Sequence, residues 1–340
     1  MAAAVCTAAL VTAGAAACGG SESGSSGGGG EKTLKVGLAY DIGGRGDKSF
    51  NDSAYAGLQR VEKELNLEIK DLEAKDGETN ADKVQRLDLL AKSGYNPIIA
   101  VGFVYTEAVT EVSKRHPDVK FGIVDSLVES PNVSSLLFAE HEASYLVGAA
   151  AALKSKTDTI GFVGGDHVPL IEKFEAGYMA GAKKVNPDIE VKVKYANEGS
   201  DGKGFKDPTS GKTIAQGQID EGADVIYHAS GLTGVGVIEA AAAKKKWAIG
   251  VDSDQYLTAP ADQKPYVLTS ALKRVDTAVF DFVKSVSDGT VKGGPTTFDL
   301  KNDGVGYSTA NKEAIKDVQA RLDELKKQII DGEIKVPDKP

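Results

Sequence analysis

Acidic residues and one lysine directly follow several short apolar runs, at the points where buried strands would end. They are Asp41, Asp125, Asp252, Asp254 and Lys273. In open parallel sheets, ligands bind outside the carboxyl ends of the strands, where these side chains would meet. Ionised carboxylates accept hydrogen bonds from vicinal hydroxyls and repel anions. The pattern predicts a site for a polyhydroxylated neutral ligand, although helix N-capping is the simpler role for each aspartate taken alone.

Phe50 stands in a loop, Gly43 to Asn51, that leads from the first predicted strand into the first predicted helix. An apolar ring in such a loop could stack on a planar base. It could equally fasten its helix to the core as a hydrophobic staple. The residue type and position leave both roles open.

A glycine-rich turn, Gly231-Leu232-Thr233-Gly234-Val235-Gly236, follows another predicted strand. Such turns can bind phosphates at a helix N-terminus. The spacing here is GxxGxG, whereas the dinucleotide fingerprint is GxGxxG. A tight turn is therefore the simpler interpretation, with Gly231 at the mouth of the predicted site.

Catalytic signatures are absent from the sequence, which contains no GxSxG elbow, P-loop or HExxH motif. Asp252 and Asp254 could in principle act as a paired acid and base. No neighbouring group that would polarise a scissile bond can be identified. We therefore expect no catalytic residues, and an enzyme that processes its ligand remains an alternative.

Charge and histidine spacing argue against nucleic acid and metal ions as binding partners. The net charge is -9, with Lys and Arg scattered among Asp and Glu, so there is no basic surface for nucleic acid. The four histidines, at positions 116, 141, 167 and 228, have no metal-ligand spacing. We expect no metal, no cofactor and no nucleic-acid partner, and a protein that works as a monomer.

The N-terminus has the pattern of an export signal. Residues 2–17 are apolar or small, too few to cross a bilayer but enough for a signal peptide. Ala15-Ala16-Ala17-Cys18 is similar to the box at which bacterial lipoprotein signals are cleaved, which predicts that Cys18 is acylated. No Lys or Arg precedes the apolar run, so we expect the true start to lie upstream. An ordinary signal peptide or an unstructured alanine-rich tail is the alternative.

Both cysteines, Cys6 and Cys18, precede the predicted folded body, so disulfides and thiol chemistry are excluded there. The stretch Gly20 to Gly30 is rich in Gly and Ser and would be a flexible tether. Together the anchor and the tether predict a protein held at the outer face of the bacterial cytoplasmic membrane.

From Thr33 onward, strand-like runs alternate with amphipathic segments of helical length, which is typical of parallel α/β units. The predicted strands are Leu34–Ala39, Leu67–Asp71, Pro97–Val101, Lys120–Val124, Val133–Phe138, Thr159–Val163, Glu190–Tyr195, Asp224–His228, Trp247–Val251 and Val267–Leu272. Predicted helices are Asn51–Leu65, Asn80–Ser93, Tyr105–His116, Ser144–Lys154, Leu170–Val185, Lys212–Glu221, Gly236–Lys245, Asp276–Ser287 and Lys312–Asp331, and a hairpin is predicted over Thr296–Gly306.

Two successive α/β sets predict two doubly wound parallel-sheet lobes with a ligand cleft between them. The expected segments are a signal peptide over 1–17, the lipidated cysteine and tether over 18–32, a first lobe over 33–142 plus about 253–288, and a second lobe over 143–252 plus about 289–340.

Six short motifs appear together and in order. They are Asp47-Lys48-Ser49-Phe50-Asn51, Glu142-Ala143-Ser144-Tyr145-Leu146-Val147-Gly148, Phe174-Glu175-Ala176-Gly177-Tyr178, Gly222-Ala223-Asp224-Val225-Ile226-Tyr227, Thr233-Gly234-Val235-Gly236-Val237 and Gly250-Val251-Asp252-Ser253-Asp254-Gln255. With them, the chain from about Leu34 to Lys335 resembles the basic membrane protein family of substrate-binding lipoproteins, which includes purine nucleoside receptors.

This resemblance implies a type I periplasmic-binding-protein fold, with two lobes joined by three crossovers, that closes on a nucleoside and delivers it to the permease of an ABC importer. It implies that Phe50 and Phe205 stack on the two faces of the base. Asp41 and Asn51 would contact the base edge, Asp125 the base or the sugar, and Asp252 and Lys273 the ribose hydroxyls.

The sequence departs from the family pattern before Phe205, where Gly199-Ser200 is followed by four further residues rather than by the aromatic. A receptor for a sugar or a signalling molecule in the same fold remains an alternative function, and so does a nucleoside-processing enzyme. A repressor-like regulator shares this core fold, but no helix-turn-helix pattern precedes Leu34.

Overall fold

The computed structural model describes residues 34–340. The predicted signal peptide, Cys18 and the whole predicted tether lie outside the described residues. Within 34–340, no helix is both long enough and apolar enough to span a membrane.

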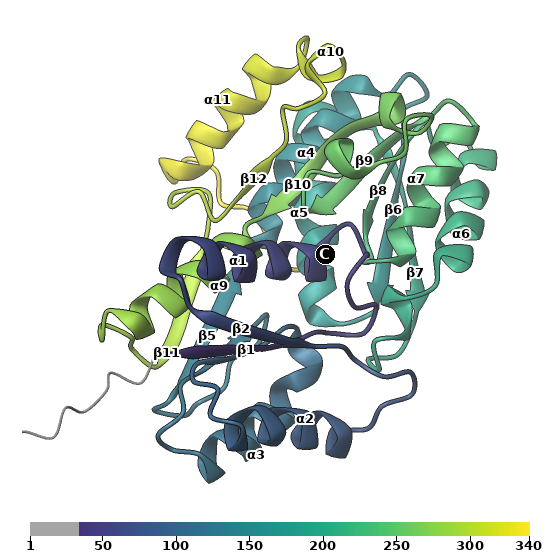
Figure 1. Cartoon of the computed structure of the whole chain (residues 1–340). Helices are drawn as coiled ribbons and strands as arrows, with labels where there is room; N and C mark the ends of the chain where they lie inside the picture. Colours follow the sequence, from purple (N-terminus) through teal and green to yellow (C-terminus); the bar gives the residue numbers. More distant parts are fainter. Residues whose placement is uncertain (1–33) are drawn as a thin grey trace, which may run out of the picture. The chain divides into compact units, whose positions relative to one another are not determined.

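The first lobe is built on a six-stranded sheet in the order β11-β5-β4-β3-β1-β2, in which every neighbouring pair is parallel. Its helices α2 and α3 cover one face of the sheet, and α1 and α9 cover the other (Figure 1). The elements are β1 (Lys35–Ala39), α1 (Phe50–Leu65), β2 (Glu68–Leu72), α2 (Asn80–Lys92), β3 (Ile98–Ala100), the 3-10 turn η1 (Phe103–Tyr105), α3 (Thr106–Arg115), β4 (Phe121–Val124), β5 (Val133–Phe138), α9 (Val275–Ser287) and β11 (Gly294–Phe298).

The second lobe has a sheet in the order β12-β10-β9-β8-β6-β7, parallel except for the pairing of β12 with β10. Helices α4 and α5 pack together on one face, and α6 and α7 on the other. The elements are α4 (Glu140–Lys154), β6 (Thr159–Asp166), α5 (Pro169–Val185), β7 (Glu190–Asn197), η2 (Lys203–Phe205), α6 (Pro208–Asp220), β8 (Val225–Ala229), α7 (Thr233–Ala243), β9 (Trp247–Asp252), α8 (Gln255–Thr258), η3 (Lys264–Tyr266), β10 (Val267–Lys273), β12 (Val305–Tyr307), α10 (Lys312–Ile315) and α11 (Gln319–Ile330).

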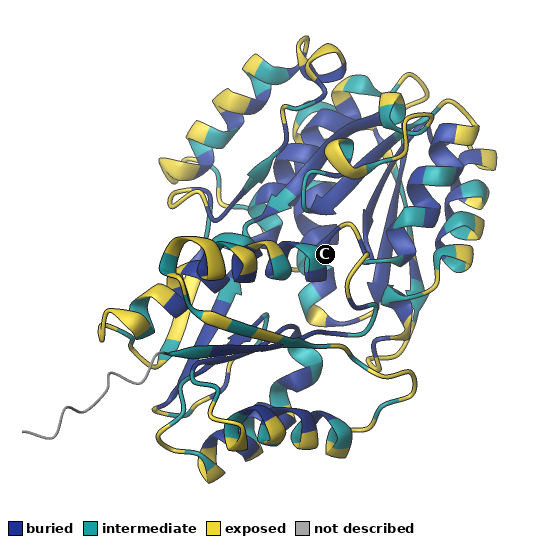
Figure 2. Cartoon of the chain, in the orientation of Figure 1, coloured by how far each residue is buried: buried dark blue, intermediate teal, exposed yellow. Residues whose placement is uncertain are grey.

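Burial follows this layering. Strands such as β1, β4 and β8 are buried along most or all of their length, and exposed residues lie on the outward faces of the helices (Figure 2). Continuous apolar runs of this kind are what a strand covered on both faces requires.

The chain crosses between the lobes three times, and backbone hydrogen bonds join the crossovers. The first crossover leads from β5 into α4 at Ala139, the second from β10 into α9 at Arg274, and the third from β11 to β12 over residues 299–304. Ala139 N donates to Phe298 O over 2.9 Å, and Arg274 N donates to Gly304 O over 2.9 Å. The crossovers thus form one bonded hinge.

Three sequence predictions for the C-terminal third are wrong. The predicted hairpin Thr296–Gly306 is instead the third crossover, because β11 pairs with β5 in the first sheet and β12 pairs with β10 in the second. The predicted helix Lys312–Asp331 is interrupted at residues 316–318, between α10 and α11. The predicted lobe boundaries place β10 in the first lobe and β11 in the second, whereas β10 pairs within the second sheet and β11 within the first.

Helices α4 and α5 approach unusually closely because glycines line their contact. A Cβ atom on Gly181 would lie 1.9 Å from the carbonyl oxygen of Tyr145, and one on Gly148 would lie 2.1 Å from that of Tyr178. No real Cβ contact is that short, so a side chain at either position forces the helices apart. The glycines therefore fix the spacing of the layer behind the second sheet.

We expect Gly181→Ala to lower the free energy of unfolding by about 1–3 kcal/mol, the usual cost of overpacking. Gly217→Ala, in α6, is the matched control because a Cβ there meets nothing within 4 Å. Alanine has the better helix propensity, so the control should be more stable by up to about 1 kcal/mol. Urea unfolding monitored by circular dichroism measures both. A Gly181→Ala protein as stable as the control would contradict the close packing.

Candidate functional site

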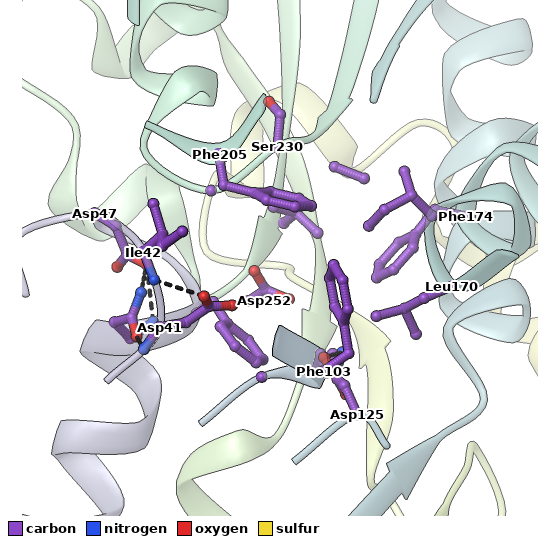
Figure 3. Close-up of a pocket in the computed structure, with 18 residues that line it drawn as sticks. Asp41, Ile42, Asp47, Phe103, Asp125, Leu170, Phe174, Phe205, Ser230 and Asp252 are labelled. Carbon is purple, nitrogen blue, oxygen red and sulfur yellow. Dashed lines mark hydrogen bonds and ion pairs between the residues drawn. The ribbon is translucent and has the colours of Figure 1, made fainter. Parts of the chain in front are cut away.

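A cavity of about 510 Å³, including its opening, lies where the carboxyl ends of the two sheets face each other (Figure 3). Eight of the nine predicted ligand-binding residues line it, namely Asp41, Phe50, Asn51, Asp125, Phe205, Gly231, Asp252 and Lys273. The topology brings them together because both sets of parallel strands end at this cleft.

Asp254 does not line the cavity. Its Oδ2 accepts a hydrogen bond from Ser308 Oγ over 2.7 Å. It is therefore not part of the described cavity, and it does not form a catalytic pair with Asp252 inside it.

The loop between β1 and α1 is organised by a buried carboxylate, Asp47. Its oxygens accept hydrogen bonds from the backbone N–H groups of Ser49, Asn51 and Asp52 over 2.8–3.1 Å. The Asn51 amide donates to Asp47 over 3.1 Å and accepts from the backbone N–H of Asp41 over 3.1 Å. Asn51 thus uses its oxygen and one N–H to hold the loop, which leaves its second N–H for a ligand.

Asp41 is the buried carboxyl at the end of β1, and it lines the cavity. Its Oδ1 accepts a hydrogen bond from Ile42 N over 2.5 Å. Burial raises the pKa of Asp41 to about 8, against the opposing effect of that hydrogen bond. At neutral pH the carboxyl is therefore largely protonated, so it can donate a hydrogen bond as well as accept one.

Lys273, at the end of β10, joins the two lobes. Its Nζ lies 2.6 Å from Asp125 Oδ2 of the first lobe and 3.2 Å from Glu140 Oε1 at the start of α4. The ammonium also lies 5.2 Å from the ring centroid of Phe50, within cation–π range. Burial by itself lowers the pKa of Lys273, but the three carboxylates of Asp125, Glu140 and Asp252 more than offset it, so the pKa is raised.

Asp252 makes a second contact between the lobes. Ser49 Oγ, from the first lobe, donates to Asp252 Oδ2 over 2.5 Å, and Ser253 Oγ donates to Ser49 O over 2.8 Å. Burial raises the pKa of Asp252 to about 7, and the nearby ammonium of Lys273 opposes the rise.

The two strand-end aspartates have left-handed backbones, with φ of 65° at Asp125 and 61° at Asp252. This conformation is rare outside glycine, and Asp tolerates it better than most residues. Strained positions of this kind cluster at functional sites.

The aromatic side chains of the cavity come from both lobes. Phe50 and Phe103 belong to the first lobe, and Phe174 and Phe205 to the second. Figure 3 shows the labelled rings of Phe103, Phe174 and Phe205 directed into the cavity, and the ring centroids of Phe103 and Phe205 are 6.3 Å apart at an interplanar angle of 70°. A planar ligand could be covered by rings from opposite sides.

The four extra residues before Phe205 do not remove it from the cavity. The carboxylate of Asp166, at the end of β6, accepts hydrogen bonds from Gly202 N over 2.6 Å and Gly204 N over 2.9 Å. The ring then packs against Gly165, where a Cβ would lie 2.2 Å from the Phe205 ring. The departure from the family pattern is thus an anchored turn that presents Phe205.

Gly231 has a φ of 53° and lies against Phe205, where a Cβ would approach the Phe205 carbonyl oxygen to 3.3 Å. The glycine turn therefore packs against the loop carrying an aromatic of the cavity. This packing fits the interpretation of the GxxGxG segment as a tight turn rather than as a phosphate-binding loop.

Sequence reasoning missed several residues at or behind the cavity, including Asp47, Phe103, Leu170, Phe174, Ser230 and Glu140. Phe174 stands in one of the recognised motifs, and Phe103 follows the end of β3, so both carried a usable signal. Glu140 carried none, because its partner Lys273 is 133 positions away in the sequence.

The raised pKa of Asp41 predicts a pH effect on stability. Its folded-state pKa of about 8 exceeds its ordinary value of 3.8, so the folded state binds the extra proton between these values. Stability contributed by Asp41 is therefore lost as pH rises through this window, at up to about 1.4 kcal/mol per pH unit. Asp41→Asn should reduce this loss in urea unfolding at pH 6, 7 and 8. Asp252 and buried His228 are present in both the wild type and Asp41→Asn, so their titration does not distinguish the two proteins. If the free energy of unfolding changes with pH equally in both, the prediction is contradicted.

Comparison with known proteins agrees with this geometry. A family model described as ABC transporter substrate-binding protein PnrA-like matches residues 34–340. The chain is 38% identical over 330 residues to the ABC transporter nucleoside-binding protein BmpA of Lactococcus lactis, covering 90% of each chain. It is 40% identical over 293 residues to an uncharacterized lipoprotein of Pyrococcus horikoshii, covering 81% of this chain and 69% of that one.

Among solved structures, a solute-binding protein of an ABC transporter system from Aeropyrum pernix superposes with a TM-score of 0.78 and 31% identity, covering 89% of this chain and 94% of that chain. The predicted type I periplasmic-binding-protein fold is confirmed. The resemblance found in the sequence motifs is confirmed as well, since the chain belongs to the Bmp family of PnrA-like ABC transporter substrate-binding proteins.

Proposed function

We propose that this protein is the nucleoside receptor of an ABC importer, that purine nucleosides are its ligands, and that the lobes close on the ligand. The observation that carries the proposal is the composition of the cavity, which combines aromatic rings from both lobes with a cluster of carboxylates and one lysine. Rings suit a planar base, and the charged cluster suits the hydroxyls of a ribose. The name of the Lactococcus lactis relative supports the same ligand class.

The two kinds of group are placed so that one ligand could meet both. Lys273, predicted to hold the ribose, lies near the ring of Phe50, the predicted stacking residue, and pairs with Asp125, the predicted base or sugar contact. Asp41 and the free N–H of Asn51 stand at the end of β1 and the start of α1, where they could read the edge of a base. Because Asp41 can be neutral or ionised near pH 7, it could serve a donor or an acceptor on that edge.

The contacts between the lobes support closure as the working motion. Ser49 with Asp252, and Lys273 with Asp125, span the cleft beside the cavity, and Lys206 Nζ lies 2.8 Å from Asp76 Oδ1 on its outer side. Opening would break these contacts, and a ligand held by both lobes would favour the closed state by its difference in affinity for the two states.

We propose further that Cys18 is acylated after cleavage of residues 1–17. The tether would then hold the receptor at the outer face of the cytoplasmic membrane, beside its permease. The name of the archaeal relative, a lipoprotein, supports this location. The receptor would then capture a dissolved nucleoside without any chemistry of its own.

The decisive experiment is a set of calorimetric titrations of residues 31–340, unfolded and refolded to remove carried ligand. The ligands are adenosine, guanosine, inosine, uridine, cytidine and ribose. We expect tight binding of the purine nucleosides and none of ribose. Binding of ribose but no nucleoside would instead favour the sugar-receptor alternative. Free base released during long incubation would favour the enzyme.

The stacking role of Phe50 gives a further prediction. Phe50→Ala should weaken nucleoside binding about 5- to 150-fold, equivalent to about 1–3 kcal/mol for one lost stack. Tyr55→Ala is the matched control, since Tyr55 is an aromatic of the same helix that packs against Arg45 and does not line the cavity. Equal affinities for the two variants would show that Phe50 only fastens α1 to the core.

A further inference from the structure

A buried carboxylate, Glu140, lies next to the cavity without lining it. It is the first residue of α4, directly after the first crossover, and its side chain is 1% exposed. Lys273 is the last residue of β10, directly before the second crossover. Their ion pair, 3.2 Å long, therefore links two of the three crossovers that form the hinge.

The two carboxylates that flank Lys273 belong to different lobes. Helix α4, which carries Glu140, packs against β10 and α5 of the second lobe, where Lys273 also lies. Asp125 follows β4 of the first lobe. When the lobes separate, Asp125 would leave Lys273, whereas Glu140 would stay beside it.

Once Asp125 has moved away, Glu140 is the carboxylate that remains within ion-pair distance of Lys273, while Asp252 of the same lobe acts only from further away. A poorly solvated ammonium that has no ion-pair partner is disfavoured and gives up its proton more readily. The rings of Phe138 and Phe174 lie 5.0 and 5.6 Å from Lys273 Nζ, within cation–π range, but this attraction is weaker than an ion pair with a carboxylate. A lysine that is neutral or turned away while the cleft is open would be a poor partner for an arriving ribose. A carboxylate within ion-pair distance has to remain beside it, and Glu140 is the one that does.

We propose that Glu140 is a positioning residue, which keeps Lys273 cationic and directed at the cavity while the lobes are apart. Ligand affinity then depends on Glu140 although Glu140 does not touch the ligand, and this affinity effect rests on the proposed nucleoside function. The cation itself can be followed without any ligand.

Other charged groups face this pair and belong in the interpretation. Lys173 of α5 lies 3.5 Å from Glu140 Oε2, and Asp252 lies close enough to affect the titration of Lys273. His141, beside Glu140 in the chain, has a pKa lowered by burial. These groups stay the same in the variants below, so differences between variants report on Glu140.

The first measurement is the titration of Lys273 in the ligand-free protein. Lysine labelled with ¹³C at Cε reports the protonation of each ammonium by NMR, and the Lys273→Arg protein assigns the signal. We expect Glu140→Gln to lower the titration midpoint of Lys273 by at least one pH unit. Glu175→Gln is the matched control, since Glu175 is a buried carboxylate of the same lobe that accepts a hydrogen bond from Tyr195 instead. In this control variant, the titration midpoint of Lys273 should equal that in the wild type.

The second measurement is nucleoside affinity by calorimetry at pH 7 and pH 9. Glu140→Gln should bind nucleoside at least tenfold more weakly than the wild type at pH 7. The difference in affinity between the variant and the wild type should be larger at pH 9. Glu140→Asp, which restores a carboxylate, should recover much of the loss. If the wild type binds no nucleoside, the proposed function fails, and the titration of Lys273 alone decides the role of Glu140.

An unchanged midpoint in Glu140→Gln overturns the inference. Should this variant fail to fold, the double variant Asp125→Asn with Lys273→Met, compared with the same protein also carrying Glu140→Gln, decides. Asp125→Asn removes the other carboxylate that pairs with Lys273, so neither protein contains an unpaired Lys273 or Asp125. If Glu140 acts through Lys273, the added Glu140→Gln should be tolerated. Failure of only the protein with Glu140→Gln to fold would mean that Glu140 serves the structure independently of Lys273, and would overturn the inference as well.

Discussion

The ion pairs of Lys273 are the interaction on which the site depends. A lysine that is only 4% exposed must be paired, and its partners come from both sides of the cleft, Asp125 from the first lobe and Glu140 from the second. Since Lys273 and Glu140 each stand at a crossover, the charge that would meet the ligand is also part of the hinge. In the proposed function, ligand binding and lobe movement would therefore be coupled through one cluster of side chains, without a long pathway between distant parts of the protein.

Burial gives the carboxylates of this cavity their chemical character. It raises the pKa of Asp41 to about 8 and that of Asp252 to about 7, while their hydrogen bonds and the ammonium of Lys273 oppose the rise. Near neutral pH these groups can change between donor and acceptor at little cost, which suits a ligand that offers hydroxyls and a heteroaromatic edge. The same burial removes these carboxyl groups from water, which costs free energy when the cleft is closed without a ligand. Contacts such as Ser49 with Asp252 offset part of this cost by satisfying the polar groups across it.

Much of the fold could be predicted from the sequence, because parallel α/β units carry strong local signals. Every predicted strand from 34 to 273 overlaps an observed one, and Val133–Phe138 matches its observed strand at both ends. The last third was harder to interpret. Two short strands separated by six residues look like a hairpin in sequence, yet β11 and β12 complete different sheets. Local periodicity cannot reveal this, since the choice of sheet depends on which edge strand, β5 or β10, is left unpaired by the rest of the chain.

The sequence by itself determined which residues stand at strand ends, and the rule that ligands bind there sufficed to bring eight predicted residues to one cavity. It also determined the family, because six short motifs in order are specific in combination. Only the tertiary structure decided that Asp254 bonds Ser308 outside the cavity, that Asp166 anchors the loop of Phe205, and that Glu140 forms an ion pair with Lys273. Each of these depends on side-chain contacts between segments far apart in the chain, and sequence spacing carries no information about them until the lobes have packed.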